Sequence, residues 1–105
     1  MPNDSEYEGN FKNNEFDGYG VFKSKSYNYY GNFNKGKMKG KGKYEDLIKG
    51  SIYDGEFFDD QKNGYGEEKY SDGSVYKGEF KNGLKDGKGI LILKNNNNES
   101  FIYNW

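Results

Sequence analysis

The sequence contains no cysteine, no histidine and no arginine, and it has one proline in 105 residues. Without cysteine and histidine, disulfides, thiolate and imidazole metal sites, cysteine nucleophiles and histidine general bases are excluded. All 16 basic side chains are lysine, and 17 acidic side chains leave a formal net charge of −1. Because arginine is the preferred residue for phosphate and base-edge recognition and the net charge is small, nucleic acid is not favoured as a partner.

Long apolar segments are missing as well. The first residues, "MPNDSEYEGN", contain no basic region followed by an apolar core, and no run is long enough to span a bilayer. We therefore expect a cytoplasmic protein, with the membrane periphery and the cytoskeleton as places where it could act. Residues 1–6 are expected to be an N-terminal tail.

Apolar residues are scarce, but aromatic residues are not. Hydrophobic residues make up 31% of the chain and the mean hydropathy is −1.25, values typical of a disordered segment. Aromatic residues, however, make up 19%, and disordered segments are poor in these large side chains. A length of 105 residues supports one domain with a modest core. The composition therefore predicts an ordered domain built on aromatic rings.

Four copies of the motif aromatic-x-Gly-x-Phe recur at intervals of 22, 24 and 23 residues. They start at Tyr7, Tyr29, Tyr53 and Tyr76. Nine residues after each motif glycine, a Gly-x-Gly pair begins, at Gly18, Gly40, Gly64 and Gly87. A partial fifth copy at 101–105 would place Phe101, Tyr103 and Trp105 in the aromatic, glycine and aromatic positions. Such a period indicates a repeat architecture, here a single repeat domain over 7–105.

The alternation within each copy is typical of a strand with one apolar face, and the Gly-x-Gly stretch is the returning strand. The tip residues between the strands tolerate positive φ, as a tight hairpin requires; they are Asn14, Gly36, Asp60 and Gly83. We expect the strand glycines to make room for rings that lie over them. The predicted fold is all-β, an elongated, open and twisted single-layer antiparallel meander of consecutive β-hairpins without helices.

The pattern Y-x-G-x-F followed by G-x-G, with the link "DGSVY" at 72–76, resembles the MORN (membrane occupation and recognition nexus) repeat family over residues 7–105. The resemblance implies hairpin repeats in an extended grooved sheet, used as protein-interaction scaffolds and often dimeric, and an association with membranes or phosphoinositides. Three features depart from the family pattern. Glu68 replaces an aromatic or aliphatic residue, Tyr103 replaces a glycine, and the first two links between repeats lack the Asp-Gly turn.

The motif rings lie on one face, and a single layer has no second layer to cover them. We therefore expect an open aromatic groove that binds an extended or helical segment of a protein partner. Its expected lining is Tyr7, Phe11, Tyr29, Phe33, Tyr44, Tyr53, Phe57, Glu68, Tyr76 and Phe80. Glu68 allows two interpretations: it is a lone acid for a partner's lysine or arginine, or a register slip turns Tyr70 inward instead.

A lysine-rich stretch, "NKGKMKGKGKY", suggests an alternative function. Four of its lysines would contact anionic lipid: Lys35, Lys37, Lys41 and Lys43. Such a cluster attracts anionic headgroups at about 1 kcal/mol per lysine, so the alternative is a peripheral membrane or phosphoinositide-binding module. Asp46, Asp54 and Glu56 follow closely and weaken the positive field, which favours a solvated hairpin.

The alternation breaks down in "GILILK", where both faces become apolar. Ile90 and Ile92 fall on the back of the sheet, and Ile102 extends the patch. A strand that is apolar on both faces requires cover on both, so we expect a dimer or partner interface formed by Ile90, Ile92, Ile102 and Trp105. The competing explanation is local burial under the loop "KNNNNES".

No catalytic constellation is visible. The carboxylates of Glu67 and Glu68 point to opposite faces of a strand, and Asp59 and Asp60 lie in a turn. No helix follows the glycine pairs, as a phosphate-binding loop would require. We therefore expect a non-enzymatic adaptor or scaffold with a protein partner, without cofactor or metal. A further alternative is a fragment or subunit of a multidomain enzyme.

Overall fold

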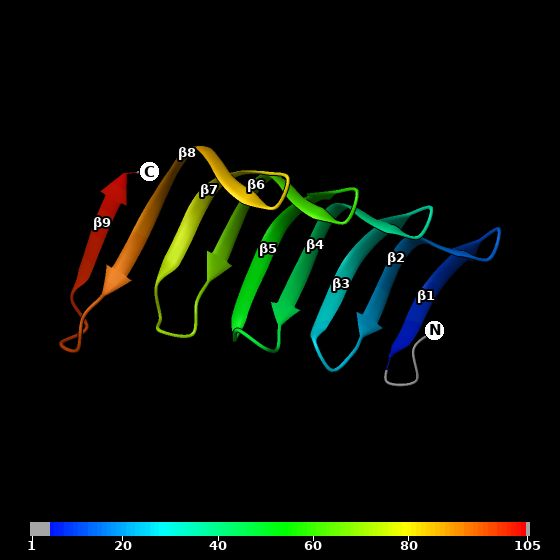
Figure 1. Ribbon diagram of the computed structural model, residues 1–105, viewed down its shortest axis with the longest axis horizontal. Coiled ribbons are helices and arrows are strands. Elements are labelled where there is room, and N and C mark those ends of the chain that lie inside the picture. Colours follow the sequence, from blue (N-terminus) through cyan, green and yellow to red (C-terminus); the bar gives the residue numbers. More distant parts are fainter. Residues whose placement is uncertain (1–4, 105) are drawn as a thin grey trace.

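The computed structural model describes residues 5–104, which form a single antiparallel sheet with its strands in sequential order (Figure 1). The strands are β1 (Glu6–Lys12), β2 (Glu15–Lys23), β3 (Tyr27–Asn34), β4 (Lys37–Asp46), β5 (Ser51–Phe58), β6 (Gln61–Lys69), β7 (Val75–Lys81), β8 (Leu84–Lys94) and β9 (Ser100–Asn104). The sheet is open and elongated, measuring 50 × 27 × 16 Å. The predicted fold, a meander of consecutive hairpins, is confirmed.

Helices are absent from residues 5–104, so this part of the chain has no helix that could cross a membrane. The expected tail at 1–6 falls mostly on residues outside the described range. Within that range β1 already begins at Glu6.

Each hairpin closes through a two-residue turn in which both residues have positive φ. The four turns are Asn13–Asn14, Lys35–Gly36, Asp59–Asp60 and Asn82–Gly83, with φ between 50° and 84°. Two consecutive residues with positive φ are characteristic of the type I′ turn, whose twist matches that of the flanking strands. The predicted tip residues are confirmed, and the residue before each of them shares the left-handed conformation.

Every hairpin also contains a bulge between the motif glycine and the motif phenylalanine. On the opposite strand, the first glycine of each Gly-x-Gly pair has φ between 73° and 96°. Glycine is needed at these four positions because the backbone at the bulge adopts a positive φ. For these four glycines the expectation that they make room for rings is wrong. A bulge bends the strand and increases its twist. As a result, the tip of each hairpin turns toward one face of the sheet, which we call the concave face (Figure 1).

Neighbouring tips are joined by backbone hydrogen bonds. The amide of Gly36 donates to the carbonyl of Phe16 (2.9 Å), and the amide of Asp60 donates to the carbonyl of Met38 (3.1 Å). The amide of Gly83 donates in the same way to Lys62 (3.0 Å). The tips therefore form a continuous rim along the concave face.

The remaining strand glycines do make room for rings, as predicted. A Cβ atom on Gly55 would lie 2.7 Å from the Tyr53 hydroxyl, and Gly66 on the adjacent strand is covered by the same ring. The Tyr53 hydroxyl donates to the carbonyl of Glu56 at the bulge (2.7 Å). Tyr7, Tyr29 and Tyr76 make the same hydrogen bond three residues along the chain. Each motif tyrosine thus lies flat on its own hairpin.

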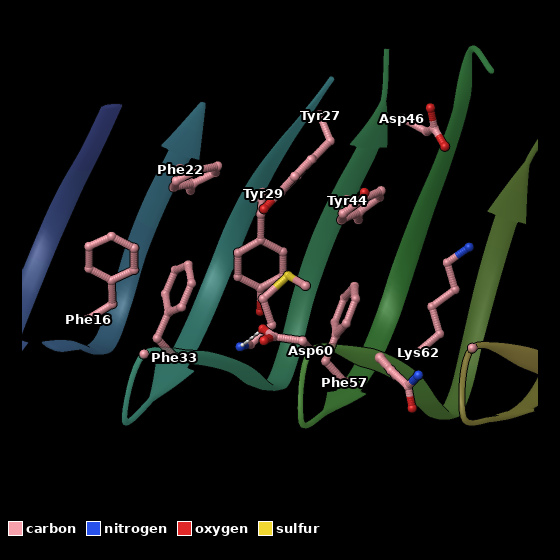
Figure 2. Close-up of a pocket in the computed structure, with 14 residues that line it drawn as sticks. Phe16, Phe22, Tyr27, Tyr29, Phe33, Tyr44, Asp46, Phe57, Asp60 and Lys62 are labelled. Atoms are coloured by element: carbon pink, nitrogen blue, oxygen red, sulfur yellow. Dashed lines mark hydrogen bonds between the residues drawn. The ribbon is translucent and has the colours of Figure 1, made fainter. Parts of the chain in front are cut away.

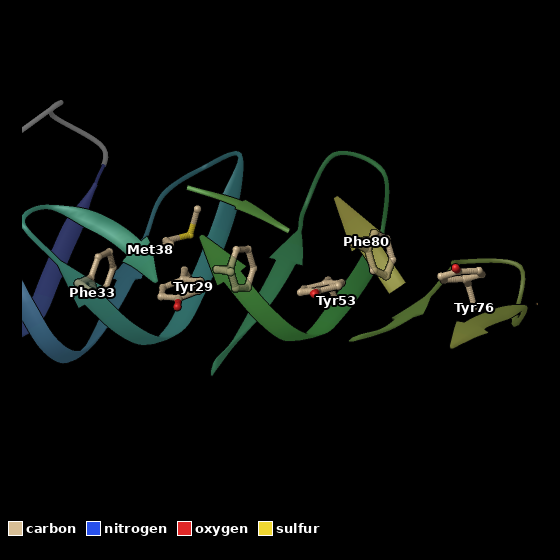
Figure 3. Packing of buried hydrophobic residues seen from close by; sticks show 7 residues of the cluster. Tyr29, Phe33, Met38, Tyr53, Tyr76 and Phe80 are labelled. Carbon is tan, nitrogen blue, oxygen red and sulfur yellow. The ribbon is translucent and has the colours of Figure 1, made fainter. Parts of the chain in front are cut away.

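The motif rings pack edge to face into a spine that runs along the sheet (Figure 3). Tyr29 contacts Phe33 of its own hairpin and Phe57 of the next, with centroids 5.0 and 5.1 Å apart. Tyr53 contacts Phe57 and Phe80 at 5.1 and 5.0 Å. Each buried ring contributes about 1.5–3 kcal/mol, and each such pair about 0.5–1.5 kcal/mol more. The spine is the core of the domain.

The links between hairpins differ in sequence, but each is ordered by hydrogen bonds with a polar side chain. Asp72 accepts hydrogen bonds from the amide and hydroxyl of Ser74 in the Asp-Gly link. In the two links that lack Asp-Gly, Ser24 bonds to the backbone of Tyr27, and Asp46 accepts from the amides of Ile48 and Lys49. One polar side chain at the start of each link is therefore sufficient to order it.

The partial fifth copy has a different register from the one predicted. Leu91 pairs with Tyr103 and Leu93 with Phe101. Since Glu68 pairs with Tyr76 at the corresponding place in the preceding repeat, Tyr103 occupies the motif tyrosine position rather than the glycine position. The link 95–99 is as long as the link 70–74, but β8 and β9 continue to pair as far as Lys94 and Ser100, beyond the point where β6 and β7 stop at Lys69 and Val75. These additional pairs shift the fifth copy by two residues, which the repeat spacing did not reveal. Trp105 lies outside the described residues.

Candidate functional site

A groove of about 540 Å³ opens on the concave face above the spine (Figure 2). We call it the concave groove. Strands β2, β3 and β4 provide most of its wall, and the hairpin tips provide the other side. It is lined by Phe16, Phe22, Tyr27, Tyr29, Phe33, Gly36, Met38, Tyr44, Asp46, Phe57, Asp60, Gln61, Lys62 and Gly83.

Three half-buried rings form a ladder along one wall of the concave groove. Tyr27 stacks on Phe22 with centroids 5.3 Å apart and on Tyr44 with centroids 4.8 Å apart. Phe16 lies nearer the tips and stacks on Tyr7 at 3.8 Å. Because the rings occupy one another's faces, they present mainly edges and hydroxyl tips to an incoming ligand. Rigid aromatic area with a polar tip is well suited to protein contacts.

The phenols of this ladder stay protonated at neutral pH. Burial, together with smaller contributions from neighbouring Tyr27 and Asp46, raises the pKa of Tyr44 to about 12. Burial also raises the pKa of Tyr27, with a smaller contribution from the carboxylate of Asp60. Both hydroxyls therefore remain available as hydrogen-bond donors.

Two carboxylates lie at the two ends of the concave groove along the strand direction, Asp46 toward the links and Asp60 toward the hairpin tips (Figure 2). Asp46 ends β4, and its Oδ1 accepts from the amides of Ile48 (3.0 Å) and Lys49 (2.9 Å). Asp60 is part of a hairpin tip, and its Oδ1 accepts from the amide of Met38 (2.8 Å). Among residues 5–104 neither carboxylate forms an ion pair with a lysine.

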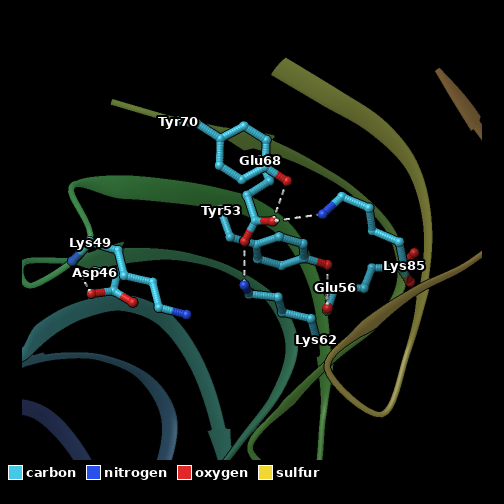
Figure 4. A network of polar contacts seen from close by, with 8 residues as sticks. All are labelled: Asp46, Lys49, Tyr53, Glu56, Lys62, Glu68, Tyr70 and Lys85. Atoms are coloured by element: carbon cyan, nitrogen blue, oxygen red, sulfur yellow. Dashed lines mark hydrogen bonds and ion pairs between the residues drawn. The ribbon is translucent and has the colours of Figure 1, made fainter. Parts of the chain in front are cut away.

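Farther along the concave face, a polar cluster replaces the rings (Figure 4). Glu68 is 6% exposed, forms an ion pair with Lys62, and lies 3.9 Å from the ammonium of Lys85. The Tyr70 hydroxyl donates to its other carboxylate oxygen at 2.7 Å. The two ammonium groups also lie over rings, Lys62 at 5.4 Å from the centroid of Tyr53 and Lys85 at 5.3 Å from that of Tyr70. We call Lys62, Glu68, Tyr70 and Lys85 the ionic cluster.

Both interpretations of Glu68 are wrong. It is not a lone acid, because Lys62 and Lys85 of the same chain already neutralise it. Nor does the register slip, since Glu68 pairs regularly with Tyr53 and Tyr76. Tyr70 directly follows the end of β6, and its hydroxyl contacts the carboxylate of Glu68, so both side chains lie on the concave face without a change of register.

The expected groove residues divide into three groups. Tyr29, Tyr53 and Tyr76 are at most 1% exposed, and Phe33, Phe57 and Phe80 are also buried. Tyr29, Phe33 and Phe57 do line the concave groove, but nearly all of the ring area of these six residues is buried rather than open, because the hairpin tips turn over the concave face. Tyr44 is half-buried and lines the concave groove. At the β1 edge Tyr7 is half-buried behind Phe16, and Phe11 is 60% exposed.

Sequence reasoning missed most of the groove wall. Phe16, Tyr27 and Met38 were not predicted as site residues, although simple parity places them there. Phe16 has the same parity as Gly20 and Phe22 in β2, and Tyr27 has the same parity as the motif in β3. The missing information was the bend of the tips, which decides which concave side chains remain accessible.

The predicted lipid-contacting lysines do not gather into one basic surface. Lys37 forms an ion pair with Asp59 (2.8 Å), and Lys43 lies 4.0 Å from Glu45. Lys41 lies directly opposite Glu56 on the next strand. Lys35 is an exposed tip residue.

The C-terminal patch lies on the convex face. Ile92 pairs with Val75 on one side and Ile102 on the other, and Ile90 and Ile92 are half-buried. Ile102 is 66% exposed, so the loop 95–99 does not bury it. That loop is held by hydrogen bonds from Asn97 and Glu99 to Asn95.

A metal-binding cluster does not occur in the part of the chain that the structure describes. The family model of the MORN repeat matches residues 7–28, 29–46, 53–75 and 76–98. A comparison with curated proteins gave no match. The matched segments cover most of the sequence, and each corresponds to one hairpin; three of the four also extend into the link that follows. MORN repeats are generally protein- or membrane-interaction modules, and by these four matches the chain belongs to the MORN repeat family.

Proposed function

We propose that this chain is a non-enzymatic adaptor that binds a segment of a protein partner in the concave groove. The observation that carries the proposal is the ladder of Phe22, Tyr27 and Tyr44, which lies half-exposed above a fully buried spine. The spine already accounts for the stability of the sheet, and these rings form a second tier with open area. Accessible aromatic groups around a concavity are a common feature of protein-binding sites.

A protein segment fits this surface better than a membrane does. Lys37 and Lys43 lie close to carboxylates, and Lys41 faces Glu56, so little positive potential is left to attract anionic headgroups. Binding through rings should persist at high ionic strength, because salt screens charges but not apolar burial.

The test uses one tyrosine on each face of the sheet. Tyr27→Ser introduces the residue found at the same position of the third and fourth repeats, Ser51 and Ser74, so the backbone is expected to tolerate it. Tyr19→Ser removes a convex tyrosine that is 58% exposed and serves as the matched control. A partner retained by the wild-type chain in high salt would be identified, purified and titrated against all three proteins.

We expect Tyr27→Ser to weaken binding at least about tenfold, as expected for a central aromatic contact, and Tyr19→Ser to leave it unchanged. Equal affinities for all three proteins would refute the groove as the binding site. Retention only at low salt, or only by vesicles of anionic lipid, would favour the membrane role instead.

We also propose that the convex patch of Val75, Ile90, Ile92 and Ile102 mediates self-association. It adjoins β9, which lies at the edge of the sheet and has one side unpaired within residues 5–104. Ile102→Lys should convert a dimer to a monomer in analytical ultracentrifugation, whereas Phe58→Lys, at another exposed apolar residue of β5, should not. A wild-type chain that is monomeric at high concentration would rule out this interface.

A further inference from the structure

The electrostatics of the concave groove restrict what it can bind. Its aromatic wall is bounded by Asp46 at the link end and by Asp60 at the tip end (Figure 2). The positive side chain that also lines it, Lys62, is already ion-paired with Glu68. The carboxylates of Asp46 and Asp60 therefore give the groove a net negative character.

These two carboxylates keep acceptor capacity for a ligand. In each, the hydrogen bonds formed within residues 5–104 engage Oδ1 and come from backbone amides. A carboxylate has about four lone-pair sites on two oxygens, so the second oxygen can accept from a cationic side chain. The influence of both charges reaches the wall, because Asp60 and Asp46 contribute to the raised pKa values of Tyr27 and Tyr44.

A basic side chain would find favourable contacts along the whole path. Lysine and arginine bury apolar stems while keeping the charged group near a carboxylate. They are also attracted to the faces of aromatic rings. The chain itself uses this arrangement in the ionic cluster, where Lys62 and Lys85 lie over rings next to Glu68.

We infer that the concave groove recognises a basic protein segment in which lysine or arginine residues flank a large apolar residue. The apolar side chain packs against Tyr27, Tyr44 and Met38, and the flanking cations pair with Asp46 and Asp60. The inference rests on the proposed function and adds the chemical class of the partner segment. A phosphate-rich headgroup or an acidic peptide would be repelled by the same two carboxylates.

The test selects ligands without assuming a partner. A phage-displayed library of random peptides is selected on three full-length proteins: the wild type, the groove variant Asp46→Asn/Asp60→Asn, and the convex control Glu8→Gln/Asp54→Asn. The two variants lose the same charge from opposite faces. Asparagine and glutamine keep an acceptor oxygen, so the hydrogen bonds of Asp46 and Asp60 to the backbone can persist. Circular dichroism and thermal unfolding verify that all three proteins are folded.

We expect the wild type and the convex control to enrich peptides with lysine or arginine beside a large apolar residue, and the groove variant to lose the basic preference. A selected peptide, synthesised with a fluorescent label, should bind the groove variant about fivefold to tenfold more weakly than the control, as expected for two partly exposed charge pairs. Its affinity for the groove variant should also depend less on salt.

Two results would overturn the inference in distinguishable ways. If the selected peptides lose affinity with Tyr27→Ser but show no basic preference, the groove binds proteins and only the charge rule fails. If no selected peptide is sensitive to Tyr27→Ser, the proposed function fails together with the inference.

Discussion

The first and second hairpins, β1–β4, share a backbone plan with the third and fourth, β5–β8, but carry a different concave surface. Opposite the motif phenylalanine and tyrosine, β4 has Met38 and Tyr44, whereas β6 has Lys62 and Glu68. We call these regions the aromatic half and the ionic half. The turns, bulges, glycines and spine are the same in both. The repeat motif therefore specifies this shared frame of turns, bulges, glycines and spine. The concave side chains that lie above the spine, which we call the second tier, can vary from repeat to repeat.

The two second tiers contribute to stability by different routes. Rings in the aromatic half gain from apolar burial and stacking. The ionic cluster must offset the desolvation of a carboxylate that is 6% exposed, and it does so with two ammonium groups and a phenol. An aromatic tier can leave room for a ligand without losing its own contacts. An ionic tier cannot easily do so, because its groups already satisfy one another.

The largest effect is expected at high pH and tests whether the halves unfold together. Burial raises the pKa of Tyr29 and of Tyr53 above 10.0, so the folded protein keeps protons that the unfolded chain loses. Their contribution is complete below pH 10 and is lost as the pH rises through 10 toward the folded values. We expect one cooperative unfolding transition, with tyrosinate absorbance and circular dichroism changing together. Two separate transitions would show that the halves are independent units.

The next largest effect compares the spine in the two halves. Tyr29→Ala and Tyr53→Ala should each lower the free energy of unfolding by about 3–5 kcal/mol, because both remove a fully buried ring. Urea unfolding measures both values. If the two losses of free energy differ by more than about 2 kcal/mol, the side chains above the spine stabilise it to different extents in the two halves, which would contradict a shared frame.

The ionic cluster gives an intermediate effect. Glu68→Ala leaves Lys62 and Lys85 without their carboxylate and should destabilise the protein by about 2–3 kcal/mol. The double variant Lys62→Met/Glu68→Tyr introduces the residues of the aromatic half. Its free energy of unfolding should be within about 1 kcal/mol of the wild-type value, or higher. Chemical denaturation distinguishes the two variants.

The matched control for this cluster is Glu67→Ala, on the convex face of the same strand. Its carboxylate lies 3.9 Å from Lys77 and its side chain is 39% exposed, so the change should stay below about 0.5 kcal/mol. If Glu67→Ala and Glu68→Ala lower the free energy of unfolding by the same amount, burial does not make the contacts of the ionic cluster more important to stability than an exposed ion pair.

The smallest effect concerns the turns. Lys35 has a φ of 50° in the aromatic half, where the corresponding residue of the last hairpin is Asn82, with φ 52°. Asparagine tolerates this conformation better than lysine. Lys35→Asn should therefore raise the free energy of unfolding by about 0.5–1 kcal/mol, and Asn82→Lys should lower it by a similar amount. Thermal unfolding of both variants measures the pair, and changes of the same sign would contradict the explanation.

The frame was predictable from the sequence because it is periodic. Spacing located the hairpins, and residue type identified the tips at Asn14, Gly36, Asp60 and Gly83. The groove was less predictable because it depends on the bulge at Gly18, Gly40, Gly64 and Gly87, which turns the tips over the spine. Parity alone cannot distinguish a glycine needed for positive φ from one that accommodates a ring. Nor could it reveal that Glu68 meets Lys62 and Lys85, which requires three strands in register.

The phenylalanines of the spine have a consequence for how such arrays change in length. Phe57 packs against Tyr53 of its own hairpin and Tyr29 of the preceding one, and Phe80 packs in the same way against Tyr76 and Tyr53. Each tyrosine hydroxyl is satisfied within its own hairpin. Neighbouring hairpins are thus joined in the spine by the same phenylalanine–tyrosine contact. Duplication or deletion of one hairpin would recreate this contact at the new junction and leave it unchanged at the others. Binding surfaces in such an array can be lengthened or shuffled in whole hairpins without redesign of the core.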